Sequence, residues 1–221
     1  MVYTFHIVTI GHLSRNRYWG EDESVAYRKA LCTCTLLSGG GEHILVDPSL
    51  PAQQMDEALL WAAGLHRADI TRVYTTHHHL DHHVDPLFPN AQWFLPQAEI
   101  DYLRNNWDDY IRTFPGDDRA NLAHAHPVGE MLADGIRVVP LPGHTEGLCG
   151  LEFDAPEGRV LLTGDAVMTR EFYQAGRPYL FGWDDAVSAE TIRGIRGRYD
   201  VIIPGHGEAF ASRAWERAAE Y

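Results

Sequence analysis

One local pattern recurs four times along the chain and restricts the folds that it can adopt. An apolar, β-branched stretch runs directly into a short turn that presents a His or an Asp, ending at His77, His144, Asp165 and His206. In three of the four copies a Gly precedes the polar residue, where it allows a sharp turn or a close backbone approach. Loops at strand ends are where rigid scaffolds carry functional groups. The pattern therefore predicts a set of β-strands whose ends hold the functional side chains.

The remainder of the chain alternates between strand-like and helix-like stretches. Hydrophobic periodicity and turn residues predict strands at 2–10, 31–37, 43–46, 70–76, 92–95, 136–141, 148–153, 159–163 and 201–203. They predict helices at 53–63, 97–113 (one helix or two), 186–197 and 208–219. No Pro/Gly/Ser-rich linker or repeat interrupts this order, so we expect a single domain over residues 1–221. The order is typical of an α/β layered fold with two sheets face to face and helices outside, although a doubly wound sheet also fits.

Composition excludes several classes of partner. Lys and Arg total 18 against 31 Asp and Glu, a formal net charge of −13, and the densest basic stretch, 193–198, contains three arginines. Such a field repels phosphate backbones, so no nucleic-acid partner is expected. No apolar run approaches the roughly 20 residues of a membrane span, and the N-terminus does not resemble a signal peptide. Three cysteines are too few for a disulfide framework. We therefore expect a soluble, acidic, cytoplasmic domain with no nucleic-acid or membrane partner.

Histidine is the most unusual feature of the composition. The chain has 13 histidines, and five of them lie between residues 77 and 83. In an extended segment residues i and i+2 share a face, so His77 and His79 can hold one metal ion together. Asp81 and His82 are adjacent, and they can address a second ion if the chain turns there. Imidazole and carboxylate are ligand types that zinc binds at about 2.0–2.2 Å.

Together these residues resemble the motifs of the metallo-β-lactamase superfamily of metallohydrolases. In chain order the motifs are Leu45-Val-Asp47, His77-x-His79-x-Asp81-His82, Pro142-Gly-His144-Thr-Glu-Gly147, Thr163-Gly-Asp165 and Pro204-Gly-His206-Gly207. They span residues 45–207 in the order typical of the family, so the resemblance covers nearly the whole chain. It implies an α/β fold, a four-layer αββα sandwich, with two divalent metal ions in a cleft at one edge. The usual metal is zinc, with iron or manganese as alternatives.

The resemblance also implies a role for each motif residue. The first metal would be held by His77, His79 and His144, and the second by Asp81, His82 and His206. Asp165 would bridge the two ions, and Asp47 would support the cluster from behind. Asp81 and Asp165 are the residues expected to act in catalysis.

Neighbouring residues receive weaker assignments. The motif gives His78 no role, and His83 is expected to pack or to lie at the surface. Cys32 and Cys34 lie on a predicted strand, where core packing is expected. Several aromatic residues are equally suited to the core or to the wall of an apolar substrate pocket: Trp107, Tyr110, Phe114, Phe172, Tyr173, Tyr179, Phe181 and Trp183.

These features predict a dinuclear hydrolase that cleaves a small ester, lactone or thioester. Two divalent ions about 3.5–4 Å apart can share a hydroxide and polarise the bond under attack. Asp165 stands where class B β-lactamases carry Cys or Ser, which argues against antibiotic hydrolysis. The substrate-assisting Tyr of the lactonase branch has no counterpart, because Met168 takes its place and leaves Tyr173 as a substitute. Two alternatives remain: a mononuclear iron oxidoreductase resembling the persulfide dioxygenases, and a non-catalytic binding domain on the same fold.

Overall fold

The computed structural model describes residues 1–83 and 88–212. Within these residues the strands form two mixed sheets of six strands each. Sheet I contains, in spatial order, β1 (Thr4–Thr9), β2 (Cys34–Gly39), β3 (Glu42–Val46), β4 (Arg72–Tyr74), β5 (Gln92–Leu95) and β6 (Ala125–Pro127). Sheet II contains, also in spatial order, β7 (Met131–Ala133), β8 (Ile136–Pro140), β9 (Cys149–Ala155), β10 (Gly158–Gly164), β11 (Val201–Pro204) and β12 (Phe210–Ala211).

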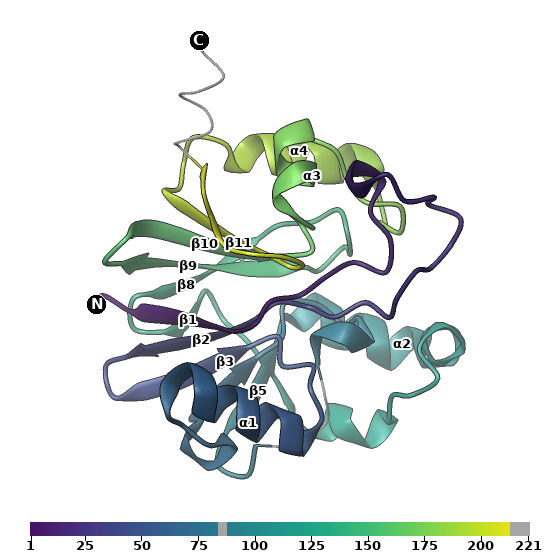
Figure 1. Cartoon of the computed structure of the whole chain (residues 1–221). Coiled ribbons are helices and arrows are strands. Elements are labelled where there is room, and N and C mark those ends of the chain that lie inside the picture. The colour runs from purple at the N-terminus through teal and green to yellow at the C-terminus, as the bar shows by residue number, and fades with distance from the viewer. Residues whose placement is uncertain (84–87, 213–221) are drawn as a thin grey trace.

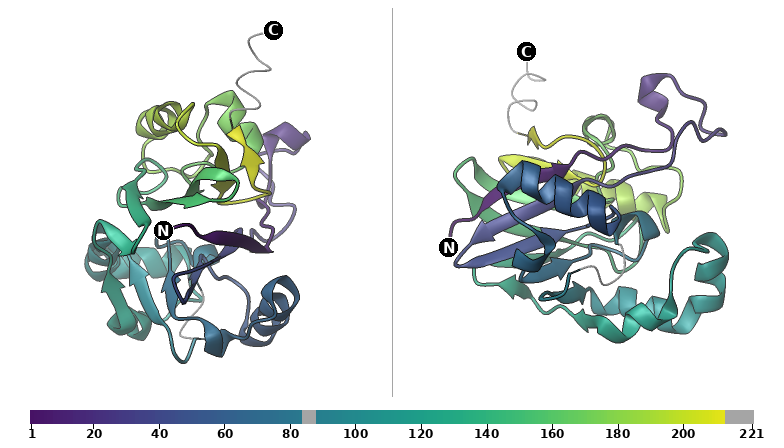
Figure 2. Two further views of the ribbon diagram at one scale, coloured as in Figure 1. Left: turned by 90° about the vertical axis from the view of Figure 1, so that its left-hand side faces the viewer. Right: turned by 60° about the horizontal axis from the view of Figure 1, so that its bottom comes forward.

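Helices cover the outer side of each sheet. Figure 1 shows α1 (Ala52–Ala63) and α2 (Gln97–Thr113) on the side of sheet I, and α3 (Arg170–Ala175) and α4 (Asp185–Ile195) on the side of sheet II. In the right-hand view of Figure 2, α1 lies across the outer face of sheet I. The order of layers is therefore αββα, as the sequence predicts. Two face-to-face sheets exclude the alternative of one doubly wound sheet.

Side-chain alternation along β3 explains the packing of sheet I. Ile44 and Val46 point into the core between the two sheets, whereas Leu45 packs on the opposite face against Met55 and Leu59 of α1. Successive side chains of a strand point to opposite faces, so a sheet covered on both sides needs apolar residues at consecutive positions. The continuous apolar run at 44–46 is the sequence signature of that double burial.

In sheet II, β10 is packed in the same way. Val160 and Leu162 enter the core between the sheets, and Leu161 packs with Ile192 and Ile195 of α4. The parallel pairing of β10 with β11 aligns Leu161 with Ile202, which belongs to the same cluster beneath the helix. The ends of β10 and β11 thus leave the sheet side by side, and each is followed by a polar loop.

Most predicted elements are present, and the differences concern short segments and the C-terminal helix. The expected helix 97–113 is α2, in which Asn106 has non-helical angles (φ −123°, ψ 24°), and α1 ends at Gly64 as predicted. The short strands β6 and β7 and the one-and-a-half-turn helix α3 are not predicted, because segments of 3 to 6 residues carry little periodicity.

The helix expected at 208–219 is wrong at its start. Residues 210–211 form β12, whose Phe210 pairs with Ile202 of β11, so sheet pairing outweighs the local helical pattern. The rest of that prediction, 213–219, lies outside the described residues. Over the described part of the chain, no helix has both the length and the hydrophobicity that crossing a membrane requires.

Candidate metal centre

The seven residues singled out by the sequence meet at one edge of the sandwich. His77 and His79 follow β4, His144 follows β8, Asp165 follows β10 and His206 follows β11. Asp81 and His82 belong to a 3-10 turn, Leu80–His82, which supplies the turn that the adjacent pair needs to reach a second position. Among the described residues, the metal-binding donors gather into two groups, with ligand atoms within 4.8 Å of one another in each.

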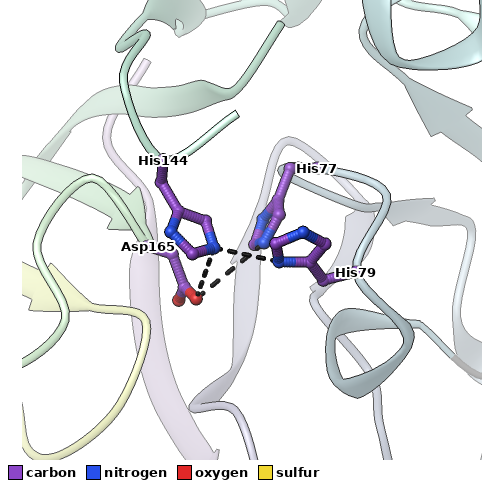
Figure 3. A group of neighbouring side chains, drawn as sticks. All are labelled: His77, His79, His144 and Asp165. Atoms are coloured by element: carbon purple, nitrogen blue, oxygen red, sulfur yellow. Dashed lines mark hydrogen bonds and ion pairs between the residues drawn. The ribbon is translucent and has the colours of Figure 1, made fainter. Parts of the chain in front are cut away.

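The first group contains His77, His79, His144 and Asp165 (Figure 3). His144 Nε2 lies 3.3 Å from Asp165 Oδ2 and 2.9 Å from His79 Nδ1. His77 Nε2 lies 3.9 Å from the same Asp165 oxygen. Two imidazole nitrogens therefore face one carboxylate oxygen, and the His79 nitrogen lies beside that of His144, so the four residues could hold a single cation.

The second group contains Asp81, His82 and His206. His82 Nε2 lies 3.1 Å and His206 Nε2 lies 3.4 Å from Asp165 Oδ1, and His206 Nε2 lies 3.8 Å from Asp81 Oδ2. The two oxygens of Asp165 are thus divided, with Oδ2 toward the first group and Oδ1 toward the second. This is the arrangement that a carboxylate needs to bridge two cations.

The outward nitrogens of three histidines are occupied, which orients their rings. Nδ1 of His77 is 3.1 Å from Thr76 Oγ1, Nδ1 of His82 is 3.0 Å from Asp47 Oδ2, and Nδ1 of His206 is 2.8 Å from the Leu31 carbonyl. Metal-binding histidines are held in this way, because the bond at one nitrogen leaves the lone pair of the other free for the ion.

The ligand atoms that point into the site show whether a cation fits there. Nε2 of His77, Nε2 of His82 and Oδ1 of Asp165 are buried, and none of them makes a well-directed hydrogen bond, although His82 Nε2 and Asp165 Oδ1 lie 3.1 Å apart. Buried polar atoms are normally paired, so such a group of inward-facing donors requires an explanation. A bound cation provides one, and the residues present therefore fit a dinuclear metal site.

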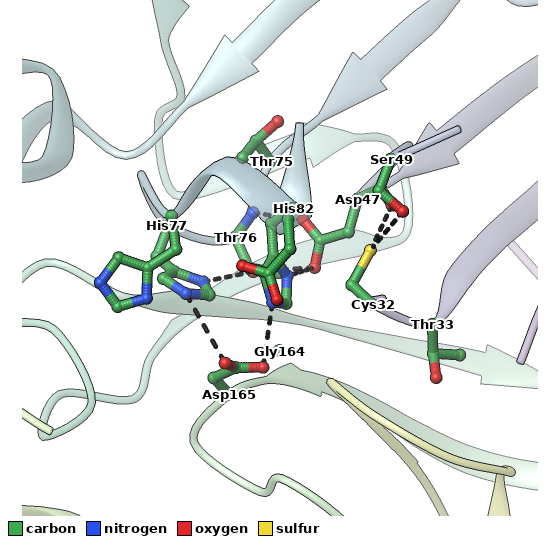
Figure 4. Close-up of polar contacts among 12 residues, drawn as sticks. Cys32, Thr33, Asp47, Ser49, Thr75, Thr76, His77, His82, Gly164 and Asp165 are labelled. Atoms are coloured by element: carbon green, nitrogen blue, oxygen red, sulfur yellow. Dashed lines mark hydrogen bonds and ion pairs between the residues drawn. The ribbon is translucent and has the colours of Figure 1, made fainter. Parts of the chain in front are cut away.

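The Asp47 carboxylate holds the loop after β4 through hydrogen bonds (Figure 4). Its Oδ1 accepts a hydrogen bond from Thr76 N and its Oδ2 accepts one from Thr76 Oγ1, both at 2.8 Å, besides the contact with His82. Asp47 has φ +50°, a left-handed conformation that no other non-glycine residue adopts among those described. Cys32 donates from Sγ to its carbonyl oxygen, and burial raises the pKa of this thiol well above the usual value. The position expected of Asp47 is therefore the one found, and Cys32 is a buried packing residue.

Two glycines before ligand positions are required by the structure. Gly164 has φ +50°, which favours glycine, and it lets the chain turn from β10 into Asp165. At Gly205 a Cβ atom would collide with the Asp165 carboxylate. The Gly that the sequence places before Asp165 and His206 thus permits a turn in one case and a close approach in the other.

Burial and charge set the protonation of the two groups. Burial lowers the pKa of His77 and His79 well below the ordinary value and lowers that of His144. It acts in the same direction on His82 and His206, but the Asp165 carboxylate outweighs it and raises the pKa of both. Without a cation, the first group therefore favours neutral imidazoles more strongly than the second group does, and metal binding competes with protons more in the second group.

The charge of Asp165 is set by the same competition. Burial opposes ionisation of its carboxyl, but the surrounding histidines hold its pKa well below the usual range. An anionic carboxylate between two sets of imidazoles is what two neighbouring cations need to offset their repulsion.

The two histidines without a ligand role are both buried. His83 Nε2 lies 3.6 Å from Asp117 Oδ2, and its ring lies beside Trp93, away from the donor groups. His78 packs its ring on Tyr102, with centroids 4.4 Å apart, and its backbone N–H donates to Glu99. Neither belongs to a donor group, but His78 has specific polar contacts that the motif does not suggest.

A cavity of about 450 Å³ opens beside the donor groups. Its apolar wall comes from three separate segments and includes Leu13, Tyr102, Tyr110, Phe114, Met168 and Phe181. Among the described residues that line it, none is Lys or Arg. The cavity can therefore bury an apolar group next to the donors; the Arg15 guanidinium lies over the ring of the lining residue Phe181, 5.5 Å from its centroid.

The aromatic candidates divide between the cavity and the core. Tyr110, Phe114, Tyr179 and Phe181 line the cavity. Tyr173 is fully buried in the cluster beneath α4, so it cannot reach a substrate as the expected substitute for the lactonase Tyr. Tyr179 is the phenol that lines the cavity on this side, although its hydroxyl donates to the Arg15 carbonyl.

The sequence analysis does not identify two supporting residues, Thr76 and Glu99. Thr76 directly precedes His77, and the sequence signal for its role is a hydroxyl side chain next to the histidine cluster. Glu99 lies on α2 and is 1% exposed, with nothing in the local pattern to distinguish it from the acidic residues on the surface. Its contacts depend on how α2 packs against the loops, so no sequence signal could have identified it.

Comparisons with known proteins agree with the geometry. The sequence matches the family described as "Metallo-beta-lactamase superfamily" over residues 28–85 and 87–206. It is 32% identical over 188 residues to a hydroxyacylglutathione hydrolase of Anaeromyxobacter dehalogenans (strain 2CP-C), covering 84% of this chain and 65% of that protein. It is 32% identical over 171 residues to metallo-beta-lactamase domain-containing protein 1 of Xenopus laevis, covering 76% of this chain and 67% of that protein. The chain thus spans about two thirds of the length of these relatives.

Among solved structures, a putative metallo-β-lactamase from Thermotoga maritima superposes with a TM-score of 0.69 at 22% identity, covering 96% of this chain and all of that one. A dizinc quorum-quenching lactonase, AidC, solved with a product, superposes with a TM-score of 0.64 at 17% identity, covering 80% and 72% of the two chains. At these identities the likeness concerns the fold. With its αββα layers, its divided Asp165 carboxylate and a family match over most of its length, the chain belongs to the metallo-β-lactamase superfamily.

Proposed function

We propose that this protein is a dinuclear metal-dependent hydrolase that cleaves a small, uncharged ester or lactone. The first ion would be held by His77, His79 and His144, and the second by Asp81, His82 and His206. The observation that carries the proposal is the division of the Asp165 carboxylate, whose Oδ2 faces one group and whose Oδ1 faces the other. A structural carboxylate has no need of this geometry, whereas a bridging one does.

The chain's own residues prepare the reaction in three ways. When bound, two such ions would supply Lewis-acid activation of water and of the bond to be broken. Asp165 holds negative charge between the two sites, and the contacts at Thr76, Asp47 and the Leu31 carbonyl fix the rings of three ligands. The apolar wall of the cavity orients the substrate and excludes water around it, which strengthens the electrostatic interactions inside.

The lining of the cavity supports an uncharged substrate. The Anaeromyxobacter relative is named for a glutathione thioester, whose carboxylates favour basic partners. The described lining residues include no Lys or Arg, and the two lining carboxylates, Asp81 and Asp165, would be taken up by the metal ions, so the side chains of the wall offer no basic partner. An acyl or aryl group fits the aromatic wall, and a neutral ester or lactone carbonyl can then lie beside the donor groups.

The two alternatives account for less of the site. A mononuclear iron enzyme needs one set of ligands, yet a second set, Asp81, His82 and His206, is assembled beside the first. A non-catalytic binding domain gives no reason for buried, unpartnered donor atoms facing inward.

Metal analysis of the purified full chain, followed by a substrate panel, tests the proposal. We expect close to two transition-metal ions per chain, and turnover of an acylated lactone or an uncharged aryl ester that chelation abolishes. One iron per chain with oxygen-dependent turnover of a persulfide would replace the hydrolase with the oxidoreductase. Cleavage of glutathione thioesters alone would overturn the uncharged substrate and leave the hydrolase intact.

A further inference from the structure

A buried carboxylate outside both donor groups connects two of the loops that carry them. We propose that Glu99 is a positioning residue for the first metal site, fixing the loop of His77 and His79 relative to the loop of His144. This inference rests on the proposed function, because it takes the first group to be a metal site. Glu99 lies in the first turn of α2 and is 1% exposed.

One oxygen of Glu99 holds the loop after β4. Oε2 accepts a hydrogen bond from the backbone N–H of His78 at 2.9 Å and makes a second contact with His78 Nδ1. His78 stands between two ligands of the first group, so bonds to both its backbone and its ring fix the peptide units that carry His77 and His79. The contacts also give His78 a task that the family motif does not assign.

The other oxygen holds the loop after β8. Oε1 accepts a hydrogen bond from Thr145 Oγ1 at 2.8 Å, and Thr145 directly follows His144. The same oxygen would lie 2.6 Å from a Cβ atom at Gly147, so this loop passes close to the carboxylate. Asp165 joins the two donor groups from inside the site, and Glu99 joins two ligand loops from outside it in a comparable way.

The charge state of Glu99 agrees with this role. Burial opposes ionisation, but the donors of His78 and Thr145 outweigh it and hold the pKa of Glu99 below its usual value. A buried anion that accepts three hydrogen bonds is costly unless all of its partners are in place. Glu99 therefore favours one arrangement of the two loops over others.

The second donor group is held by other residues. His82 is fixed by Asp47 and His206 by the Leu31 carbonyl, and no contact with Glu99 is recorded for either within the described residues. If Glu99 acts through positioning, its loss must weaken the first site more than the second. A merely structural role would weaken both sites together.

The test measures zinc affinity at one site at a time. In the full chain, His206→Ala leaves the first group complete and His144→Ala leaves the second complete. Zinc is titrated against a chromogenic chelator in each background, with and without Glu99→Gln. Loss of an outer hydrogen-bonding partner typically costs about 10–100-fold in metal affinity. We expect a loss of that size in the His206→Ala background and less than about a twofold change in the His144→Ala background.

Two further variants separate positioning from folding. Thr145→Val removes the hydroxyl at nearly constant volume and should weaken zinc binding in the His206→Ala background, whereas Thr145→Ser should restore it. Glu57→Gln, the same substitution at an exposed position of α1, serves as the matched control and should change neither affinity.

The outcomes of the two proposals are distinct. Equal zinc affinity with and without Glu99→Gln in the His206→Ala background would overturn the role of Glu99 and leave the metal site standing. Equal losses in both backgrounds would also overturn it, because the effect would then be general destabilisation. If the unmutated chain binds no zinc, the proposed function itself fails.

Discussion

The loops that carry His77, His144, Asp165 and His206 each follow a strand directly, whereas the wall of the substrate cavity comes from segments that share no such pattern. Leu13 belongs to the N-terminal loop, Tyr102 to α2 and Phe181 to the segment before α4. Strand ends are rigid and hold ligands to within fractions of an ångström, while loops and helix faces determine what fits beside them. The comparison predicts that metal binding and substrate choice can be changed separately in this protein.

Replacing the carboxylate that faces both donor groups should have the largest effect, because Asp165 would belong to both proposed metal sites. Asp165→Ala should lower metal occupancy of both sites and cut kcat by about 10²–10³-fold or more. Both the generation of the nucleophile and the stabilisation of the transition state would depend on the two metal ions. Metal analysis and kcat on one ester substrate measure this. Asp154→Ala, at an exposed position of β9, is the control. Full metal content with normal turnover in Asp165→Ala would remove the basis for a bridged centre.

Changing the support beneath the loops should have an intermediate effect. In Asp47→Asn an amide NH₂ replaces either Oδ1, which accepts from Thr76 N, or Oδ2, which accepts from Thr76 Oγ1 and faces His82 Nδ1, so one or two donors lose their acceptor. We expect losses of about 10–100-fold in zinc affinity or kcat, as is typical for partners of metal-binding histidines. Zinc titration and steady-state kinetics check this. If Asp47→Asn raised only KM, a residue of the ligand loops would control substrate binding, which would contradict the division of roles between these loops and the cavity wall.

Changing the cavity wall should affect substrate binding and spare the metals. Phe181 lines the cavity and is 60% exposed, so a substrate can bury it further. Phe181→Ala should raise KM for an apolar ester by about tenfold, the size expected when roughly 1.5 kcal/mol of apolar burial is lost. Phe181→Leu should restore most of this loss, and Trp61→Ala, at the exposed surface of α1, should change nothing. Loss of metal in Phe181→Ala would contradict the comparison.

The smallest expected effect is on the pH dependence of stability at Glu99. This residue belongs to α2, which contributes to the cavity wall, and its carboxylate contacts His78 and Thr145 in the ligand loops. Its pKa is depressed in the folded protein, so its contribution to stability is present above the unfolded-state pKa and is lost as pH falls through the folded value. In metal-free protein, the destabilisation by Glu99→Gln should be constant above about pH 5 and should shrink below about pH 4. Urea unfolding across this range measures it. A difference that grows toward acid pH would mean that the native carboxyl is protonated.

The strands and long helices could be predicted because their patterns are local. The apolar run at 44–46 indicates a strand that is buried on both faces, and Gly64 indicates the end of α1. Each signal lies within a few residues of the element that it predicts. The prediction fails where pairing with a distant strand decides the structure, as at Phe210, which pairs with Ile202 in place of forming a helix. Short strands such as β6 and β7 are held by their neighbours and contain too few residues for a period to appear.

The sequence by itself singled out the polar residues that gather at the edge, and its resemblance to the family implied their division into two groups. Alternation along an extended segment places His77 with His79, and the turn at Leu80–His82 directs Asp81 and His82 to a second position. Only the tertiary structure decided which Asp165 oxygen faces which group, that Glu99 holds the loops around His78 and Thr145, and that Tyr173 lies in the core while Tyr179 lines the cavity. The physical reason is distance along the chain: these contacts join segments that are from about twenty to nearly ninety residues apart, and they exist because the two sheets and their helices pack together.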